Sequence, residues 1–206
     1  NYDVVNNRYS AWNYLKSHIR SVIIDEGITS VGSFNFWDCS ELVSVTIPGT
    51  VTDIGASAFS CCTKLPQVQL PEVITKIAAE TFASCHNLTS IHIPESVTQI
   101  GEYAFVYSGL TEITIPDTVT RMRENMFEDC KNLRSAVLGK GIEYLPSNTF
   151  KGCTSLSRVE IRSQSLSEVG DGSFEGCISL MSIYLGASVE TIEKNAFRYC
   201  YHLVEV

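Results

Sequence analysis

The sequence predicts a β-rich solenoid, in which short coils stack along one axis and carry a parallel sheet on one face. Three observations predict this fold. An apolar phrase recurs every 22–24 residues, apolar and polar residues alternate within it, and a proline follows it in four copies. A fixed period of this length is the signature of a solenoid, where each coil buries its apolar face only against its neighbours.

Phenylalanine gives the register of the repeat. It recurs eight times, with successive gaps of 22–24 residues: Phe36, Phe59, Phe82, Phe105, Phe127, Phe150, Phe174 and Phe197. Three residues after each Phe comes Cys39, Cys62, Cys85, Ser108, Cys130, Cys153, Cys177 or Cys200, and a leucine then follows every time. We expect the eight phenylalanines to form a buried structural column behind the sheet.

Each coil should contain two extended pieces and one tight turn. In the second copy, Leu42–Pro48 alternates like a strand with Val45 and Ile47 inward, and the proline ends the strand because it has no N–H for the ladder. A second extended piece follows at Val51–Ile54, and glycine then permits a tight turn at Gly55, as at Gly32 and Gly101. The Ala-Phe pair should lie in a brief helical turn.

Two copies depart from the regular length. Ser108-Gly109 replaces Cys-x-x, and we expect the glycine to absorb a one-residue deletion without moving Leu110 off its strand position. One extra residue around 162–165 lengthens the loop before Leu166. Both edits lie outside the strands, where a change of register would turn every side chain to the other face.

The chain divides into a cap and an array. Residues 1–18 should form an N-terminal cap segment, since 10–16 resembles a short capped helix with Trp12 and Leu15 on one side, and open sheet edges invite aggregation. Residues 19–206 should form the array, with eight repeats plus a truncated final strand, and 19–24 as the first strand. The sequence stops halfway through a ninth strand, so we expect the natural protein to continue.

Composition excludes several classes of function. The net charge is −8 at pH 7 and the pI is near 5.0, which argues against binding to nucleic acid or to an anionic membrane surface. No run of 18 apolar residues occurs, so we expect no membrane insertion in this segment. The sequence predicts no cofactor. It does not define an oligomeric state.

The repeated phrase I-P-x-x-V-T-x-I-G-x-x-A-F-x-x-C-x-x-L resembles the BspA-type leucine-rich repeat, also called the Treponema pallidum type. The segment from Ile93 to Leu110 matches it nearly throughout, and the resemblance covers 12–206. It implies a leucine-rich-repeat solenoid: a right-handed superhelix with a concave parallel sheet of about nine short strands. Departures from the phrase, such as Met122-Arg123 for Ile-Gly, predict less regular repeats near 120–165.

The resemblance also implies a place and a role. Such arrays belong to bacterial or parasitic protist surface or secreted proteins that bind host proteins or other cells. A cell-surface or extracellular location and a protein ligand are therefore expectations that the family resemblance implies.

Side-chain chemistry points away from catalysis and from metal binding. Cysteine is a good small buried hydrophobe, so we expect the cysteines of the column to be free buried thiols, with Cys61 the most accessible. No C-x-x-C pair occurs, which makes a zinc site improbable. Cys85-His86 suggests a nucleophile and a base, but adjacent residues point in different directions, and no catalytic motif occurs.

We therefore predict a non-enzymatic protein-binding scaffold for adhesion or partner recognition, with its ligand on the concave strands. The exposed strand positions vary from copy to copy, which a recognition scaffold needs. The candidate binding residues are Thr46, Gln69, His92, Glu112, Thr114, Val137, Arg158, Glu160 and Tyr184. Two alternatives stay open: a structural spacer array whose concave face has no ligand, and a substrate-recognition module of a longer enzyme.

Overall fold

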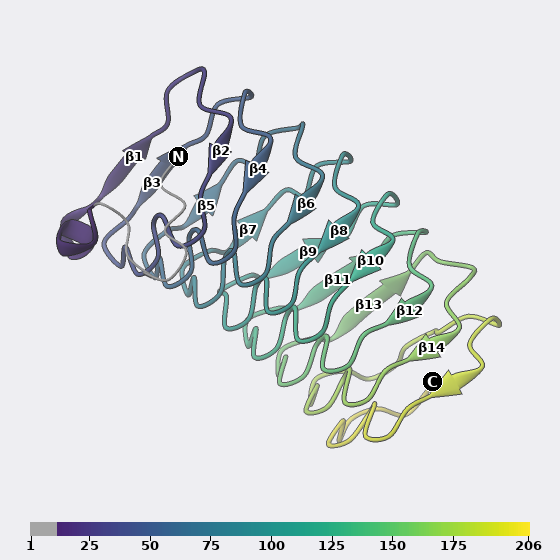
Figure 1. Ribbon diagram of the computed structural model, residues 1–206. Coiled ribbons are helices and arrows are strands. Elements are labelled where there is room, and N and C mark those ends of the chain that lie inside the picture. The colour runs from purple at the N-terminus through teal and green to yellow at the C-terminus, as the bar shows by residue number, and fades with distance from the viewer. Residues whose placement is uncertain (1–11) are drawn as a thin grey trace.

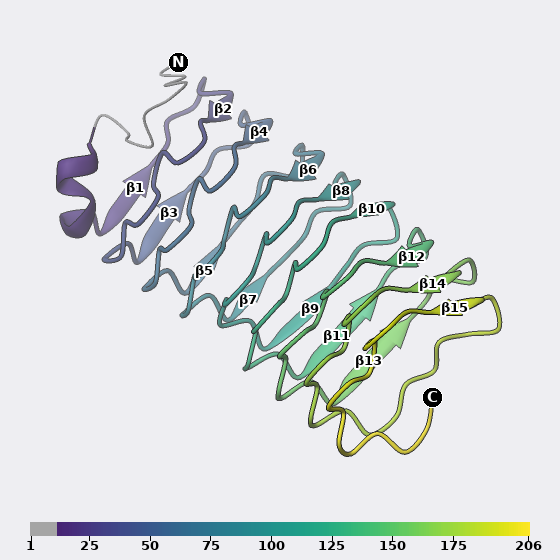
Figure 2. The ribbon, with the colours of Figure 1, turned by 60° about the horizontal axis from the view of Figure 1, so that its bottom comes forward.

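The chain winds into stacked coils, and each coil has three sides (Figure 1). The computed structural model describes residues 12–206. One side of each coil is a short strand, the next is a second, shorter strand, and the third is a turn that contains the repeated phenylalanine. We call the three sides of the solenoid the first-strand face, the second-strand face and the turn face. Figure 2 shows the two strand faces side by side.

The first-strand face consists of parallel strands, which pair residue by residue within three separate groups of neighbouring coils. Its strands are β1 (Ser21–Ile23), β3 (Ser44–Thr46), β5 (Gln67–Val68), β7 (Ser90–Ile91), β9 (Glu112–Thr114), β11 (Ser135–Leu138) and β13 (Arg158–Ile161). At the last two positions an isolated parallel bridge joins Ser182 to Glu205. Among the described residues, seven strands and this bridge stand where nine strands were predicted. The final coil has a neighbour on one side only, and its pairing is correspondingly short.

The second-strand face also consists of parallel strands, one at the second extended piece of each coil, and they pair within three groups of neighbouring coils. Its strands are β2 (Ser30–Val31), β4 (Asp53–Ile54), β6 (Lys76–Ile77), β8 (Gln99–Ile100), β10 (Arg121–Met122), β12 (Tyr144–Leu145), β14 (Glu168–Val169) and β15 (Thr191–Ile192). The prediction of a second extended piece in each coil is confirmed.

The turn face is not helical, contrary to the prediction. In every coil the residues two before and two after the Phe have positive φ, as at Ser57 (55°) and Cys61 (62°) around Phe59. The Phe59 N–H donates to the carbonyl oxygen of Thr81 in the next coil (3.1 Å), whereas the Ser60 N–H donates back to Ser57 (3.2 Å). Successive N–H groups thus alternate between the next coil and their own coil. A helix would keep all of these bonds within one coil, so the stacking of coils selects the turn instead.

The glycines before this turn also act differently from the prediction. Gly32, Gly55 and Gly101 do not have positive φ, and non-glycine residues occupy most of the left-handed positions. Gly101 is needed for close approach, because a Cβ there would lie 2.5 Å from the Ala79 backbone nitrogen. The absence of a side chain, rather than backbone freedom, lets this coil lie against the preceding one.

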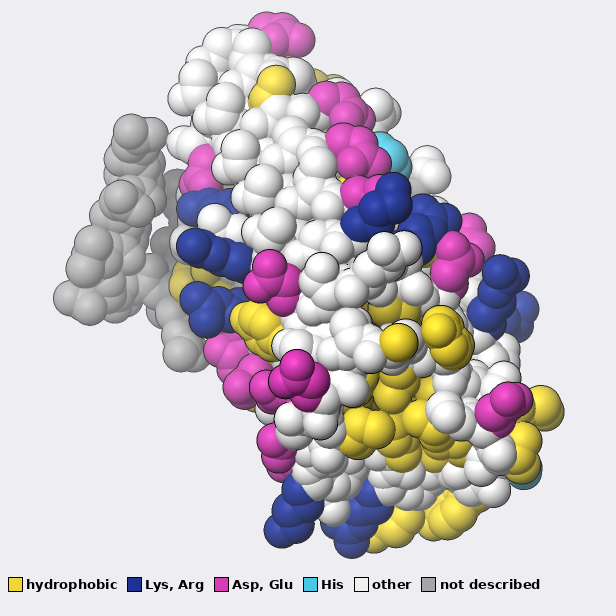
Figure 3. All heavy atoms as spheres, turned by 90° about the vertical axis from the view of Figure 1, so that its right-hand side faces the viewer, with side chains coloured by type: hydrophobic (Ala, Val, Ile, Leu, Met, Phe, Trp, Pro, Cys, Tyr) yellow, Lys and Arg dark blue, Asp and Glu magenta, His cyan; other side chains and the backbone are white. Residues whose placement is uncertain are grey.

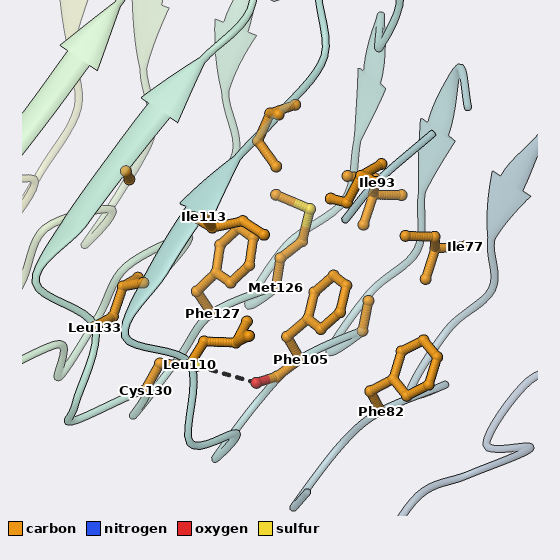
Figure 4. Packing of buried hydrophobic residues seen from close by; sticks show 14 of the residues in the cluster. Ile77, Phe82, Ile93, Phe105, Leu110, Ile113, Met126, Phe127, Cys130 and Leu133 are labelled. Atoms are coloured by element: carbon orange, nitrogen blue, oxygen red, sulfur yellow. Dashed lines mark hydrogen bonds between the residues drawn. The ribbon is translucent and has the colours of Figure 1, made fainter. Parts of the chain in front are cut away.

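The phenylalanine rings form a continuous stack through the interior. Neighbouring ring centroids from Phe36 to Phe197 lie 5.2–5.8 Å apart, and Figure 4 shows three of the rings among the aliphatic side chains that surround them. The first seven rings are buried, and Phe197 in the last coil is half-buried. Offset stacking of this kind is favourable beyond the burial of the rings.

Trp12 continues the ring stack at the N-terminal end. Its ring lies 5.5 Å from Phe36, and its Nε1–H donates to the carbonyl oxygen of Asn35 across 2.8 Å. The 3₁₀ helix η1 (Asn13–His18) follows without a side-chain capping bond, and Leu15 is 44% exposed instead of packing against the array. The part of the predicted cap at residues 1–11, including the capped start at Ser10, lies outside the described residues.

Both length edits leave the strands in register. Leu110 stays fully buried after the deletion, and Ile113 pairs with Ala136 in the next coil. The prediction that the deletion spares the strand is confirmed. Near 120–165, where less regular repeats were predicted, β11 and β13 have four residues each and are the longest strands of the first-strand face. Loss of the proline that ends earlier strands lets both continue to a fourth residue.

Candidate functional site

The predicted binding residues all lie on the first-strand face. Register places Thr114, Val137 and Glu160 opposite one another in successive coils. Glu112 and Arg158 flank Ser135 in the neighbouring row. Thr46 pairs with Ile23, whereas Gln69 and His92 each follow directly after a strand, and Tyr184 lies two residues beyond the bridged Ser182.

Most of these side chains face solvent, as the alternation of each strand dictates. Val137 and Glu160 are half-buried, and the other seven predicted residues are exposed. Tyr184 has 79% of its surface exposed, and Ile23 at the opposite end of the face has 74%. The face therefore presents large apolar or aromatic side chains at both ends and mostly polar ones, such as Thr46 and Gln69, between them.

An ion-pair cluster lies on the C-terminal part of the face. The Arg162 Nε is 2.8 Å from Glu160 Oε1, and the Arg158 Nη2 is 3.5 Å from Glu160 Oε2. The hydrogen bond from Arg162 holds the pKa of Glu160 below its ordinary value. One carboxylate thus lies within ion-pair distance of two guanidinium groups, and the cluster keeps a net positive charge on an acidic protein.

Exposed apolar side chains lie beyond this cluster. Met181 is 64% exposed, Tyr184 79% and Val204 87%. Figure 3 shows apolar side chains gathered on the lower part of the molecule, where the C-terminal coils lie, with charged side chains around them. Exposed apolar side chains near charged groups are typical of interaction surfaces.

The sequence-based prediction missed two residues of this area, Arg162 and Met181. Arg162 was assigned to the lengthened loop, but β13 runs to Ile161 and places it beside Glu160. Its two-residue spacing from Glu160 on an extended segment was the signal available in the sequence. Met181 lies one residue before the bridged Ser182 and three before the candidate residue Tyr184. No pattern in the sequence distinguishes it.

The N-terminal part of the face carries weaker polar contacts. The Nε2 of His92 lies 3.9 Å from Glu72 Oε1, and both side chains are largely exposed. Exposed pairs at this distance contribute little free energy. The N-terminal strands therefore offer hydrogen-bonding groups without a fixed charge arrangement.

The cysteines form no nucleophilic site. All eight are free thiols. Cys61 and Cys200 are half-buried and the other six are buried, so Cys200 is partly accessible as well as Cys61. Burial raises the pKa of Cys85 to about 12, and its thiol donates to the carbonyl oxygen of Phe59 across 3.2 Å. The neighbouring His86 instead places its Nδ1 2.9 Å from the Tyr107 carbonyl oxygen. The two side chains do not pair, and a thiol with this pKa is a poor nucleophile at neutral pH.

Within residues 12–206, no group of three or more His, Cys, Asp or Glu side chains could hold a metal ion. No helix in the same part of the chain is long and apolar enough to cross a membrane.

Known proteins share this architecture. The crystal structure of a Treponema pallidum leucine-rich repeat protein is 30% identical, with a TM-score of 0.71 over 78% of this chain and 77% of that one. A leucine-rich cell surface protein from Faecalibacterium prausnitzii is 25% identical, with a TM-score of 0.50 over 90% of this chain and 72% of that one. The pneumococcal vaccine antigen PcpA shares the fold at 18% identity and a TM-score of 0.50, over 84% of this chain and 57% of that one. None of the curated protein sequences compared with the chain matches it.

The repeat itself matches a family model. The BspA-type leucine-rich repeat region matches residues 9–134 and 124–206, in 6 copies. These ranges include every coil that the structure describes. The chain therefore belongs to the BspA-type leucine-rich repeat family.

Proposed function

We propose that the chain is a non-enzymatic recognition scaffold that binds a protein partner through the C-terminal half of the first-strand face. The observation that carries the proposal is the presence on one part of this face of a mostly exposed aromatic ring, Tyr184, and of the ion-pair cluster of Arg158, Glu160 and Arg162. Tyrosine and arginine dominate binding hot spots because each joins a large contact area to a polar group. Side chains held in place before binding lose less entropy on association.

We further propose that the array acts at a cell surface or outside the cell, in adhesion or host recognition. One structural relative is described as a cell surface protein, and another as a vaccine antigen. The expected right-handed superhelix, with the first-strand face as its concave side, belongs to the same proposal. Solenoid curvature would give a partner an extended groove to fill.

A titration of surface variants tests the binding proposal. The probes are purified extracellular and cell-surface proteins, immobilised singly and titrated with the chain at fixed salt concentration. For any protein that binds, Tyr184→Ala combined with Arg158→Ala should weaken binding by more than about 1 kcal/mol and leave thermal stability nearly unchanged. Thr46→Ala on the N-terminal part of the face is the matched control and should change neither quantity.

The same titration separates this proposal from the alternatives. Equal affinities for the wild type, the double variant and the control would contradict the proposal and leave the first-strand face idle, as a spacer array requires. A footprint on the turn face around Trp37 and Lys151 would also contradict it. Reduced turnover of a catalytic domain on the same polypeptide, with no separate protein partner, would instead support the substrate-recognition module.

A further inference from the structure

The second-strand face carries a group of cations that the proposed function does not use. Lys76, Gln99 and Arg121 occupy the same position in three successive strands, and register aligns them across β6, β8 and β10. Arg123 follows two residues after Arg121, so both arginines project from the same side of one extended segment. Lys76, Arg121 and Arg123 are all exposed. Three cations thus stand within three coils of a protein whose net charge is −8.

These cations border a shallow hollow. Its volume is about 130 Å³, and its lining includes Lys76, Gln99, Arg121 and Arg123. Ala78 and Gly101 also line the hollow. In their own coils they occupy the repeat position that Arg123 occupies in the following coil. Gly101 cannot gain a side chain without displacing the backbone of Ala79, which a Cβ would approach to 2.5 Å. The close packing of two coils therefore keeps the hollow open, and the long Arg123 side chain forms its wall.

The two arginines lack a carboxylate partner. Lys76 Nζ lies 3.0 Å from Asp53 Oδ1, whereas no carboxylate among the described residues approaches Arg121 or Arg123 within 4.0 Å. Glu124, which follows Arg123 in sequence, and Glu168 line a second hollow that Arg123 also borders. The guanidinium groups are thus available for an external anion.

We propose that this hollow binds one oxyanion group, a sulfate, phosphate or carboxylate, either as a free ion or carried on an acidic saccharide. A planar guanidinium matches such groups with two parallel hydrogen bonds. Gln99 adds a neutral N–H donor, and Lys76 adds a positive charge two coils away. The volume admits one anionic group, and the open rim leaves room for the sugar that carries it. Because this site lies on another face, it does not depend on a protein partner at Tyr184.

A titration with two probes tests the proposal and identifies the source of the anion. Sodium sulfate and a sulfated heparin-type tetrasaccharide are added to the chain at constant ionic strength, because screening alone alters exposed charges. The amide resonances of Gly101 and Gln99 are followed by NMR. Saturable shifts with sulfate identify a free ion, and shifts with the tetrasaccharide alone identify a saccharide-borne group.

Charge-matched variants give the decisive comparison. Arg121→Gln with Arg123→Gln should weaken binding at least about tenfold, since it removes two charge-assisted donors. The control, Arg20→Gln with Arg134→Gln, makes the same change in net charge at two exposed arginines beside the first strands and should bind like the wild type. Equal weakening in both double variants, or no saturable shift with either probe, would overturn the proposal. Melting temperatures equal to that of the wild type in both variants would show that neither change disturbs the fold.

Discussion

The thiol of Cys130 donates a hydrogen bond across 3.0 Å to the carbonyl oxygen of Phe105 in the preceding coil (Figure 4). The same bond recurs throughout the column, from Cys62, Cys85, Cys153, Cys177 and Cys200 to the preceding phenylalanine carbonyl. Cysteine therefore does more than fill apolar space, since it also supplies a donor to a carbonyl that lies beside the core. Alanine or valine at these positions would fill part of the space and lose the bond.

The buried thiols should make the protein sensitive to alkaline pH. Burial raises the pKa of Cys130 from 9.0 to about 12 and that of Cys85 from 9.0 to about 12. Between about pH 9 and pH 12 these thiols are protonated in the folded chain and ionised in the unfolded chain. The unfolded chain therefore binds fewer protons, and the free energy of unfolding falls as the pH rises. The slope is roughly 1.4 kcal/mol per pH unit for each such thiol, and it vanishes below about pH 9. Urea unfolding at a series of pH values measures it.

A serine variant separates the thiols from other groups that titrate at high pH. Cys85→Ser with Cys130→Ser keeps a hydroxyl donor at each position but removes the titrating group. Serine already occurs once in the column, at Ser108, whose hydroxyl lies 3.2 Å from the Cys130 thiol. Its stability should fall less steeply above pH 9 than that of the wild type. Parallel pH profiles for the two proteins would show that the thiols do not control alkaline unfolding.

The phenylalanine stack should dominate the stability of the array. Phe105 is fully buried, with ring neighbours at 5.8 Å and 5.4 Å. Phe105→Ala should cost about 3–5 kcal/mol through the lost contacts and the cavity, and it should weaken the adjoining coils because they share its interfaces. Phe105→Leu, which keeps most of the volume, should cost much less. A loss below about 1 kcal/mol for the alanine variant in urea unfolding, the range of ordinary surface changes, would contradict a structural role.

Trp12 should protect the first coils. Its ring covers Phe36, and its indole N–H bonds the Asn35 carbonyl oxygen, so Trp12→Ala removes both the stacking and the hydrogen bond. Trp12→Phe retains the stacking and leaves the carbonyl without its donor, which costs about 1–3 kcal/mol. Hydrogen exchange should show faster amide exchange at Val31 and Phe36 in both variants, and more strongly in the alanine variant. Unchanged protection in both would show that Trp12 does not close the array.

The fold was largely predictable because the repeat encodes it many times over. Phenylalanine spacing located every coil, and alternation located both extended pieces. The turn around Phe59 was not predictable as a non-helical turn, because Ser57 and Cys61 rarely adopt positive φ. Only the hydrogen bonds between neighbouring coils select that backbone, and a single repeat read alone does not contain them.

The candidate site was predictable only as a face. Alternation identifies which side chains point outward, and it placed Thr114, Val137 and Glu160 in one row. It does not show that Glu160 holds two arginines, because Arg162 follows a strand whose length depends on pairing with its neighbour. Lys76 and Arg121 lie two coils apart, so the sequence of a single repeat does not show that these cations lie near one another.

Gly109 should be the residue that makes the shortened coil possible. Its N–H donates to the carbonyl oxygen of Cys85 across 3.1 Å, and a Cβ at this position would overlap the carbonyl of His86. The shortened turn therefore lies directly on the backbone of the preceding coil, which keeps Leu110 in line with the other leucines. Gly109→Ala must push the two coils apart, and overpacking of this kind typically costs about 1–3 kcal/mol.

Gly49→Ala is the matched control, because a Cβ there would meet nothing within 4 Å. It should leave the urea midpoint nearly unchanged, whereas Gly109→Ala should lower it and speed hydrogen exchange at Glu112 and Ile113 in the strand that follows. The comparison removes the general effect of replacing glycine on the unfolded chain, which both variants share. Equal midpoints for the two variants would mean that the coil relaxes around the added methyl group, and that the deletion at 108–109 does not require glycine.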